Sequence, residues 1–158
     1  HSCRNTLLTQ PLRFSTIYCS KYVMVCVITL LTQLWFTVLY LIAGKVVGLP
    51  GLPPIDILGW IFRGTIGGWV IATIQYLVAS VLPNFAIPVA VGLLGGISGL
   101  LMANTKAGIF YPYSLMVLGM NSNKDDNMLG GLLPTFFLFT LFYILLFNLI
   151  GVRLLKKR

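Results

Sequence analysis

The fold is decided by residues 64–105, GTIGGWVIATIQYLVASVLPNFAIPVAVGLLGGISGLLMANT, a stretch that contains no charged residue. A helix crosses the hydrocarbon core of a membrane with about 20 apolar residues, so this stretch is long enough for two crossings and too long for one. Pro83 and Asn84 lie near its middle and are typical of a tight turn. The stretch therefore predicts two membrane-spanning helices joined by a short connection.

Two further charge-free stretches lie on either side of this one. Residues 22–44 and residues 127–152 each have the length of a single span. The sequence therefore predicts an all-α integral membrane protein, a bundle of four transmembrane helices. The four spans are expected near residues 22–43, 64–82, 85–104 and 131–152.

The overall composition excludes several other classes of protein. Of the 158 residues, 58% are hydrophobic and only 9% are charged, too few for the surface of an ordinary soluble domain. The mean hydropathy of +0.93 excludes a disordered chain. The net charge of +8 is spread thinly along the chain and forms no dense basic face, so no nucleic-acid partner is expected. Core helices of a soluble protein are the alternative to membrane spans, but four of them in so short a chain are not expected.

The positions of the basic residues predict the orientation. Residues 1–21 form a basic segment before the first span, and residues 153–158 form a basic tail after residues 22–152, the transmembrane domain. The two long loops contain fewer basic residues, and acids partly offset them. By the positive-inside rule, both termini are expected on the cytoplasmic side of a multi-pass protein of the cell membrane.

Small and polar residues recur at helical spacing within the spans. Thr29, Gln33 and Thr37 form a polar stripe on one face of the first span, either as hydrogen-bonding glue between helices or as the lining of a polar path. Glycines on the second and third spans are expected to let these two helices pack closely as a hairpin. These glycines are Gly64, Gly68, Gly92, Gly95, Gly96 and Gly99.

Residues that could perform chemistry are scarce. The only histidine is His1, the three acids all lie in loops, and no phosphate-binding loop is present. We therefore expect no enzyme activity and no catalytic, cofactor-binding or metal-binding residue in this chain. Asp125 and Asp126 could hold a cation, but a solvated turn is the favoured interpretation. The absence of acids within the spans also argues against ion-coupled transport.

The loop before the last span is too apolar for a free loop and too short to cross the membrane. Phe110, Tyr111, Pro112 and Tyr113 lie in it, and Pro112 prevents one straight helix. We expect a short interfacial or re-entrant element on the outer face. Its aromatic residues are either anchors in the membrane interface or parts of a gate.

The segment before the first span resembles the cytoplasmic segment of ABC-2 type permeases. It reads LLTQPLRFS over residues 7–15 and is followed by Lys21 at the membrane boundary. Leu8, Pro11, Leu12 and Lys21 match that pattern, whereas the usual small residue before Arg13 is missing. The resemblance implies a six-span fold with both ends in the cytoplasm, of which this chain is the last four spans and hence a C-terminal fragment.

The outer segment AGIFYPYSL at residues 107–115, followed by Gly119 and Met120, is similar to that of permease subunits that protect lantibiotic producers. Those subunits in turn resemble bacitracin-type export permeases. This resemblance implies self-protection, in which a lantibiotic-like or other amphipathic peptide is moved away from the cell membrane.

The resemblance also implies the partners. ATP would be bound and hydrolysed by a separate ATP-binding cassette ATPase subunit, and a second permease copy or a paralogue would complete the membrane domain. Leu8, Pro11, Leu12 and Arg13 would receive the conformational change of the ATPase. The alternatives are an ABC-2 exporter of drugs or polysaccharide, and a non-transporting membrane scaffold or sensor subunit. A membrane-embedded enzyme is disfavoured.

Overall fold

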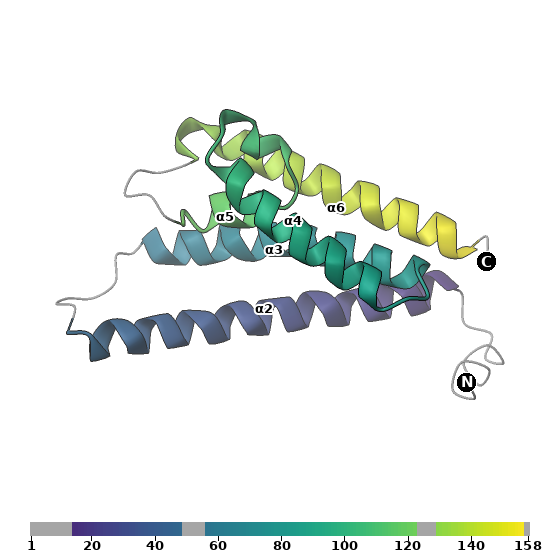
Figure 1. Ribbon diagram of the computed structural model, residues 1–158, viewed down its shortest axis with the longest axis horizontal. Helices are drawn as coiled ribbons and strands as arrows, with labels where there is room; N and C mark the ends of the chain where they lie inside the picture. Colours follow the sequence, from purple (N-terminus) through teal and green to yellow (C-terminus); the bar gives the residue numbers. More distant parts are fainter. Residues whose placement is uncertain (1–13, 49–55, 123–128, 157–158) are drawn as a thin grey trace.

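The computed structural model describes residues 14–48, 56–122 and 129–156, and in this part of the chain it contains helices and turns but no strand. Four long helices are joined by shorter ones (Figure 1). The long helices are α2 (Phe14–Val46), α3 (Asp56–Val81), α4 (Ala86–Ala103) and α6 (Leu133–Lys156). The short ones are the 3₁₀ helix η1 (Lys106–Phe110), the one-turn helix α5 (Leu115–Gly119) and the 3₁₀ helix η2 (Gly130–Leu132).

The structure confirms the predicted all-α membrane fold. Four helices of the described chain are long and apolar enough to cross a membrane: Thr16–Val46, Asp56–Val81, Ala86–Ala103 and Gly130–Leu154. The first two extend beyond the charge-free stretches, because α2 already begins at Phe14 and α3 at Asp56. Lys21 and Arg63 lie within these helices, since lysine and arginine favour helix and a charge does not end one.

The local sequence explains where the helices start. Asn84 lies in the turn between α3 and α4, and its side-chain oxygen accepts a hydrogen bond of 2.9 Å from the backbone N–H of Ala86. Pro88 and Pro134 each lie in the first turn of their helix. Proline is tolerated there because the first N–H groups of a helix have no partner within it.

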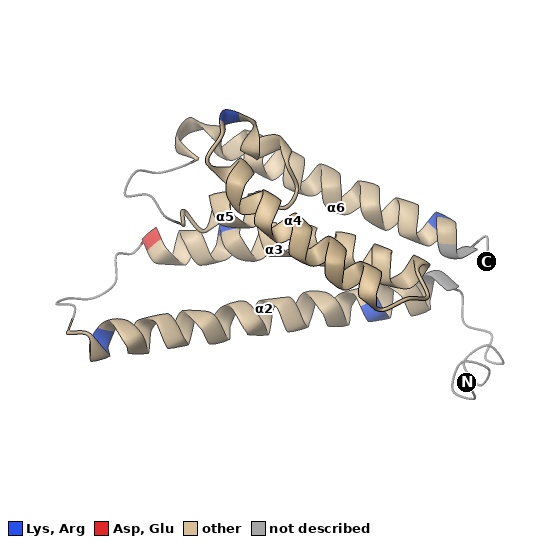
Figure 2. Ribbon diagram, in the orientation of Figure 1, with Lys and Arg blue, Asp and Glu red and all other residues tan. Residues whose placement is uncertain are grey.

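The chain passes four times between the two ends of the bundle (Figure 1). The start of α2, the turn between α3 and α4, and the end of α6 lie at one end, on the right of the picture. Lys45 in the last turn of α2, Asp56 at the start of α3 and Lys106 at the start of η1 therefore lie toward the other end. Lys21 in the first part of α2 and Arg153 near the end of α6 lie toward the first end. Figure 2 shows Lys and Arg toward both ends of the bundle. Tyr18 of α2 closely approaches Gly151 of α6, which joins the beginning and the end of the described chain.

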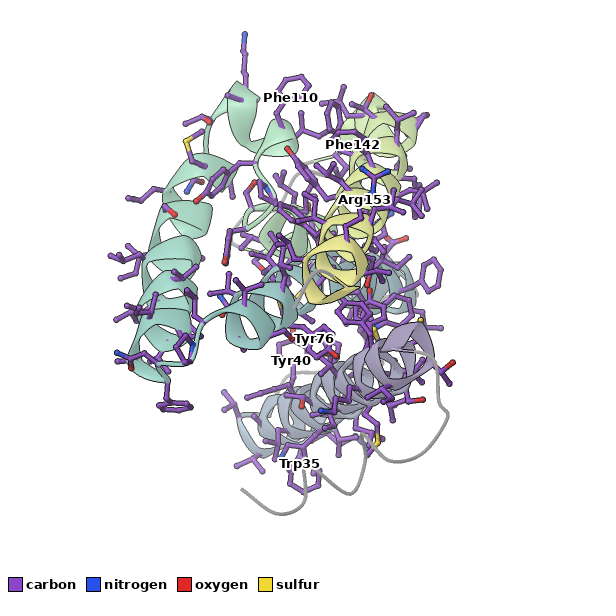
Figure 3. All side chains as sticks on the ribbon, turned by 90° about the vertical axis from the view of Figure 1, so that its right-hand side faces the viewer. Trp35, Tyr40, Tyr76, Phe110, Phe142 and Arg153 are labelled. Atoms are coloured by element: carbon purple, nitrogen blue, oxygen red, sulfur yellow. The ribbon has the colours of Figure 1, made fainter. Side chains whose placement is uncertain are left out.

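The outer surface of the bundle is strongly apolar. Large hydrophobic side chains are exposed along α2, α4 and α6. Trp35, for example, is 62% exposed and points away from the other helices (Figure 3). Such a surface is expected where lipid tails surround the helices.

The core of the bundle lies around the connection between α4 and α6. Ile109, Tyr113, Leu115 and Leu118 of this connection are buried against the long helices. The residues they pack with are Val70, Ile74, Ala103, Leu129 and Phe136. The connection is therefore part of the core and is not a surface loop.

Candidate functional site

Residues 105–122, which we call the inserted segment, fold back into the bundle between α3, α4 and α6 (Figure 1). Its backbone groups bond largely within the segment: the N–H of Gly108 donates to Thr105, that of Tyr111 to Gly108, and that of Leu118 to Ser114. The Ser114 hydroxyl also donates to the backbone carbonyls of Gly108 and Tyr111. Such pairing is required wherever backbone lies away from water.

Glycine makes room for this segment at four points. A Cβ atom on Gly67 of α3 would lie 2.6 Å from the backbone of Met116, and one on Gly99 of α4 would lie 2.6 Å from the carbonyl oxygen of Tyr113. Within the segment, Gly108 contacts the backbone of α4, and a Cβ on Gly119 would lie 2.7 Å from the carbonyl oxygen of Arg63. Only glycine permits backbone contacts this close.

Two glycines of α3 that the sequence singled out lie beside methionines of the inserted segment. A Cβ on Gly64 would collide with the side chain of Met120. One on Gly68 would lie 3.4 Å from the Thr29 methyl group of α2 and 3.8 Å from the Met116 sulfur. These positions therefore accommodate the inserted segment and α2.

The glycines of α4 were expected to pack against the preceding span, and the structure corrects this for most of them. Gly95 and Gly99 both lie against Tyr113 of the inserted segment, and Gly96 has nothing within 4 Å. Gly92 alone faces α3, with the end of the Gln75 side chain 3.0 Å from the position of a Cβ. α3 and α4 meet at Gln75 and Gly92, as a hairpin would, and the inserted segment lies between them at Gly67 and Gly99.

Gln75 of α3 joins the inserted segment to α4. In the orientation that satisfies both ends of its amide, the oxygen accepts hydrogen bonds from the Tyr113 hydroxyl at 3.0 Å and from the N–H of Gly92 at 3.1 Å. Its nitrogen donates to the carbonyl of Pro88 at 3.0 Å. In a regular helix the N–H of Gly92 would bond to the carbonyl of Pro88. The Gln75 amide therefore bonds to both the donor and the acceptor of one backbone pair of α4.

Burial raises the pKa of Tyr113. The Tyr113 hydroxyl therefore stays protonated and remains a donor at neutral pH. Gln75 is not among the site residues predicted from the sequence. The signal was available, because a glutamine inside a charge-free span is itself a polar group that needs partners.

The other aromatic residues of the segment are held by different helices. The Tyr111 hydroxyl lies 2.7 Å from that of Ser98 in α4. The Phe110 ring meets Phe139 of α6 edge-on at 4.9 Å, and the Phe110 carbonyl accepts a 2.5 Å hydrogen bond from Tyr143. Pro112 is half-buried between the two tyrosines. Phe110 is exposed, as an interface anchor would be, whereas Tyr113 is buried against protein.

The polar stripe of α2 divides into two kinds of residue. The hydroxyls of Thr29 and Thr37 donate to the carbonyls one turn before them, Val25 and Gln33, at 2.8 Å each. Gln33 is only 5% exposed, and its side-chain nitrogen points to the sulfur of Met120 at 3.6 Å. Gln33 is therefore the member of the stripe that reaches the inserted segment.

A groove of about 520 Å³ opens beside Gln33, between α2, the first turns of α3 and the end of the inserted segment. None of the described residues that line it is charged. They are Gln33, Phe36, Thr37, Tyr40, Ile57, Trp60, Ile61, Met116, Met120, Asn121 and Ser122. Asn121 adopts a left-handed backbone conformation, with a φ of 51°, where the chain turns at the end of α5.

Other predicted residues lie outside the described part of the chain. Leu8, Pro11, Leu12 and Arg13 precede residue 14, and the Asp125–Asp126 pair lies within residues 123–128. Among the residues that the structure describes, no group of three His, Cys, Asp or Glu side chains could hold a metal ion.

The comparisons with known proteins assign a family. Residues 3–99 match the family model described as "ABC-2 family transporter protein". No curated protein and no solved structure matches the chain. The match includes α2, α3 and α4 as far as Gly99, and hence the glycines of α3 and α4 that contact the inserted segment. The chain therefore belongs to the ABC-2 transporter family and is a multi-pass membrane permease subunit.

Proposed function

We propose that the protein is the membrane-spanning part of an ATP-driven exporter that moves lantibiotic-like or other amphipathic peptides away from the cell membrane. The observation that carries the proposal is the charge distribution of the bundle. The charged residues of the described helices lie toward their ends (Figure 2), and the groove beside Gln33 is uncharged. An apolar path with a few polar groups suits an amphipathic substrate, and it offers no buried carboxylate for ion coupling.

The energy for transport would come from a partner. ATP would be bound by a separate ATP-binding cassette subunit on the cytoplasmic face, together with a second permease copy or paralogue in the membrane. Both termini would face the cytoplasm, in accordance with the basic residues at the two ends of the sequence. Nucleotide binding would then shift the spans between two conformations, as any ligand-driven transition requires.

The coupling to the ATPase would involve Leu8, Pro11, Leu12 and Arg13. This segment directly precedes α2, and α2 forms one wall of the groove. A movement of the segment would therefore reach the groove through a single helix. The segment is basic, which suits a contact with an acidic patch of a partner.

Replacement of Pro11 and Arg13 by alanine tests this coupling. We expect the resistance of cells to an added lantibiotic and the peptide-stimulated ATPase rate of the co-purified complex to fall together, while the amount of protein in the membrane is unchanged. Thr32→Val, on the exposed face of α2, is the matched control and should change neither readout.

If resistance and ATPase rate both stayed at the level of the unchanged protein, the coupling assignment would be wrong. If no ATP-hydrolysing subunit co-purified with the chain, the exporter itself would be excluded in favour of a scaffold or sensor. Resistance to unrelated drugs, with none to lantibiotics, would instead assign a drug exporter.

A further inference from the structure

The groove beside Gln33 has the size of a ligand-binding site. Its volume of about 520 Å³ lies within the usual range for small-molecule pockets, roughly 300–1,000 Å³. A whole amphipathic peptide does not fit in this volume, whereas two or three of its apolar side chains do. The groove is also open to its surroundings, because Phe36 and Tyr40 on its α2 side are more than half exposed.

The wall of the groove is largely apolar and adaptable. Ile57, Trp60 and Ile61 form the α3 side, and Met116 and Met120 form the side of the inserted segment. Methionine side chains are flexible and polarizable, so they accommodate apolar groups of different shape. Because the described residues that line the groove are uncharged, a charged group of the substrate would gain no ion pair with them by entering it.

Gln33 gives the groove a buried polar group with a weak partner. Its amide is almost fully buried, yet the partner of its nitrogen is the Met120 sulfur at 3.6 Å. A thioether is a weak acceptor, so a carbonyl oxygen brought into the groove would be a better one. The neighbouring Thr37 hydroxyl already donates to the Gln33 backbone carbonyl and does not compete.

We propose that this groove binds an uncharged apolar segment of a membrane-bound peptide, with the Gln33 amide donating to a backbone carbonyl of that peptide in place of the Met120 sulfur. The identity of the peptide rests on the proposed function. The groove would then determine which peptides are taken: it admits apolar side chains and leaves the basic residues of an amphipathic peptide outside.

Two adjacent residues of α2 allow a direct test. Phe36 lines the groove, whereas Trp35 points away from the bundle (Figure 3), and both are 62% exposed. A photoreactive benzoylphenylalanine is placed at one or the other position of the full chain in lipid nanodiscs. The probe is a biotinylated 18-residue amphipathic helix of leucine and lysine, and crosslinked products are identified by mass spectrometry.

We expect saturable crosslinking of the peptide at position 36, lost with excess unlabelled peptide, and only weak, non-saturable crosslinking at position 35. Gln33→Leu should reduce the product at position 36 by about fivefold, the effect of one lost hydrogen bond. Thr32→Val, one residue away on the exposed face, should leave it unchanged.

Equal peptide crosslinking at the two positions would show simple partition into the bilayer and would overturn the proposal. Crosslinking of phospholipid alone at position 36, with peptide present, would overturn it in favour of a lipid site. The comparison of positions 36 and 35 holds Gln33 constant, so it remains decisive if Gln33→Leu fails to fold. It needs no ATPase, so its failure is separate from a loss of resistance or of ATPase coupling.

Discussion

Gly99 and Gly96 show how much depends on a single residue in α4. The backbone of Tyr113 occupies the position that a side chain at Gly99 would need, whereas the space beside Gly96 is empty. The two residues lie one helical turn apart in the same helix. The contact at Gly99 is between backbones, so no side-chain rearrangement can relieve a clash there.

Gly99→Ala is therefore expected to destabilise the protein by about 1–3 kcal/mol, because overpacking displaces the inserted segment. Gly96→Ala is the matched control and should change stability by no more than about 0.5 kcal/mol. Thermal unfolding in detergent, followed by the loss of the monodisperse peak in size-exclusion chromatography, measures both. Equal unfolding temperatures for the two variants would contradict the position of the segment.

At the scale of elements, the inserted segment is attached separately to each helix around it. Tyr113 bonds to Gln75 of α3, Tyr111 to Ser98 of α4, and Phe110 packs on α6. Hydrophobic burial distinguishes poorly between protein and lipid in a membrane, so close packing and hydrogen bonds decide which elements associate. Gln75 makes the largest number of these contacts, since it bonds both to Tyr113 of the inserted segment and to Pro88 and Gly92 of α4.

A double-mutant cycle tests the Gln75–Tyr113 contact. Gln75→Leu should destabilise the protein more than Tyr113→Phe, because it removes the bonds to α4 as well. The two changes should be coupled by about 0.6 kcal/mol, the average for a hydrogen bond within a membrane protein. Gln75→Leu and Tyr111→Phe serve as the control pair and should be additive, since Tyr111 bonds to Ser98. Additive effects in the first pair would show that the contact contributes nothing.

At the scale of the whole molecule, the basic residues and the helix order divide the bundle into two ends. Lys21 and Arg153 lie toward the end where α2 begins and α6 ends, whereas Lys45 in the last turn of α2 and Lys106 at the start of η1 lie toward the other end. The groove is lined by the second half of α2 and the first turns of α3, so it belongs to the end with Lys45. If both termini are cytoplasmic, the groove lies in the outer half of the membrane.

Cysteine labelling tests this orientation. After replacement of the native cysteines, Lys106→Cys should react with a membrane-impermeant maleimide added to intact cells, since Lys106 is exposed at the start of η1, directly after α4, toward the end of the bundle with Lys45. Arg153→Cys, exposed near the end of α6, should react only after the cells are opened. The reverse pattern of labelling would invert the proposed topology and place the groove in the inner half.

Hydropathy alone was sufficient to predict the number of helices and the membrane setting. A span depends on the composition of one local stretch, and the four long apolar helices of the described chain overlap the charge-free stretches. The aromatic character of residues 110–113 also indicated that this connection is not an ordinary loop. Leu8, Pro11, Leu12 and Arg13 lie outside the described residues, and their role stays a prediction.

The partners of the small and polar residues could not be inferred from the sequence. Glycine spacing predicts that something approaches closely, but Gly95 and Gly99 receive Tyr113, which follows in a separate segment, and not the neighbouring span. The hydrogen-bond partners of Gln75 and Gln33 are likewise distant in the chain: Gln75 bonds to Tyr113, and Gln33 contacts the Met120 sulfur. Hydropathy is a property of consecutive residues, whereas close packing and hydrogen bonding are properties of residues that the fold brings together.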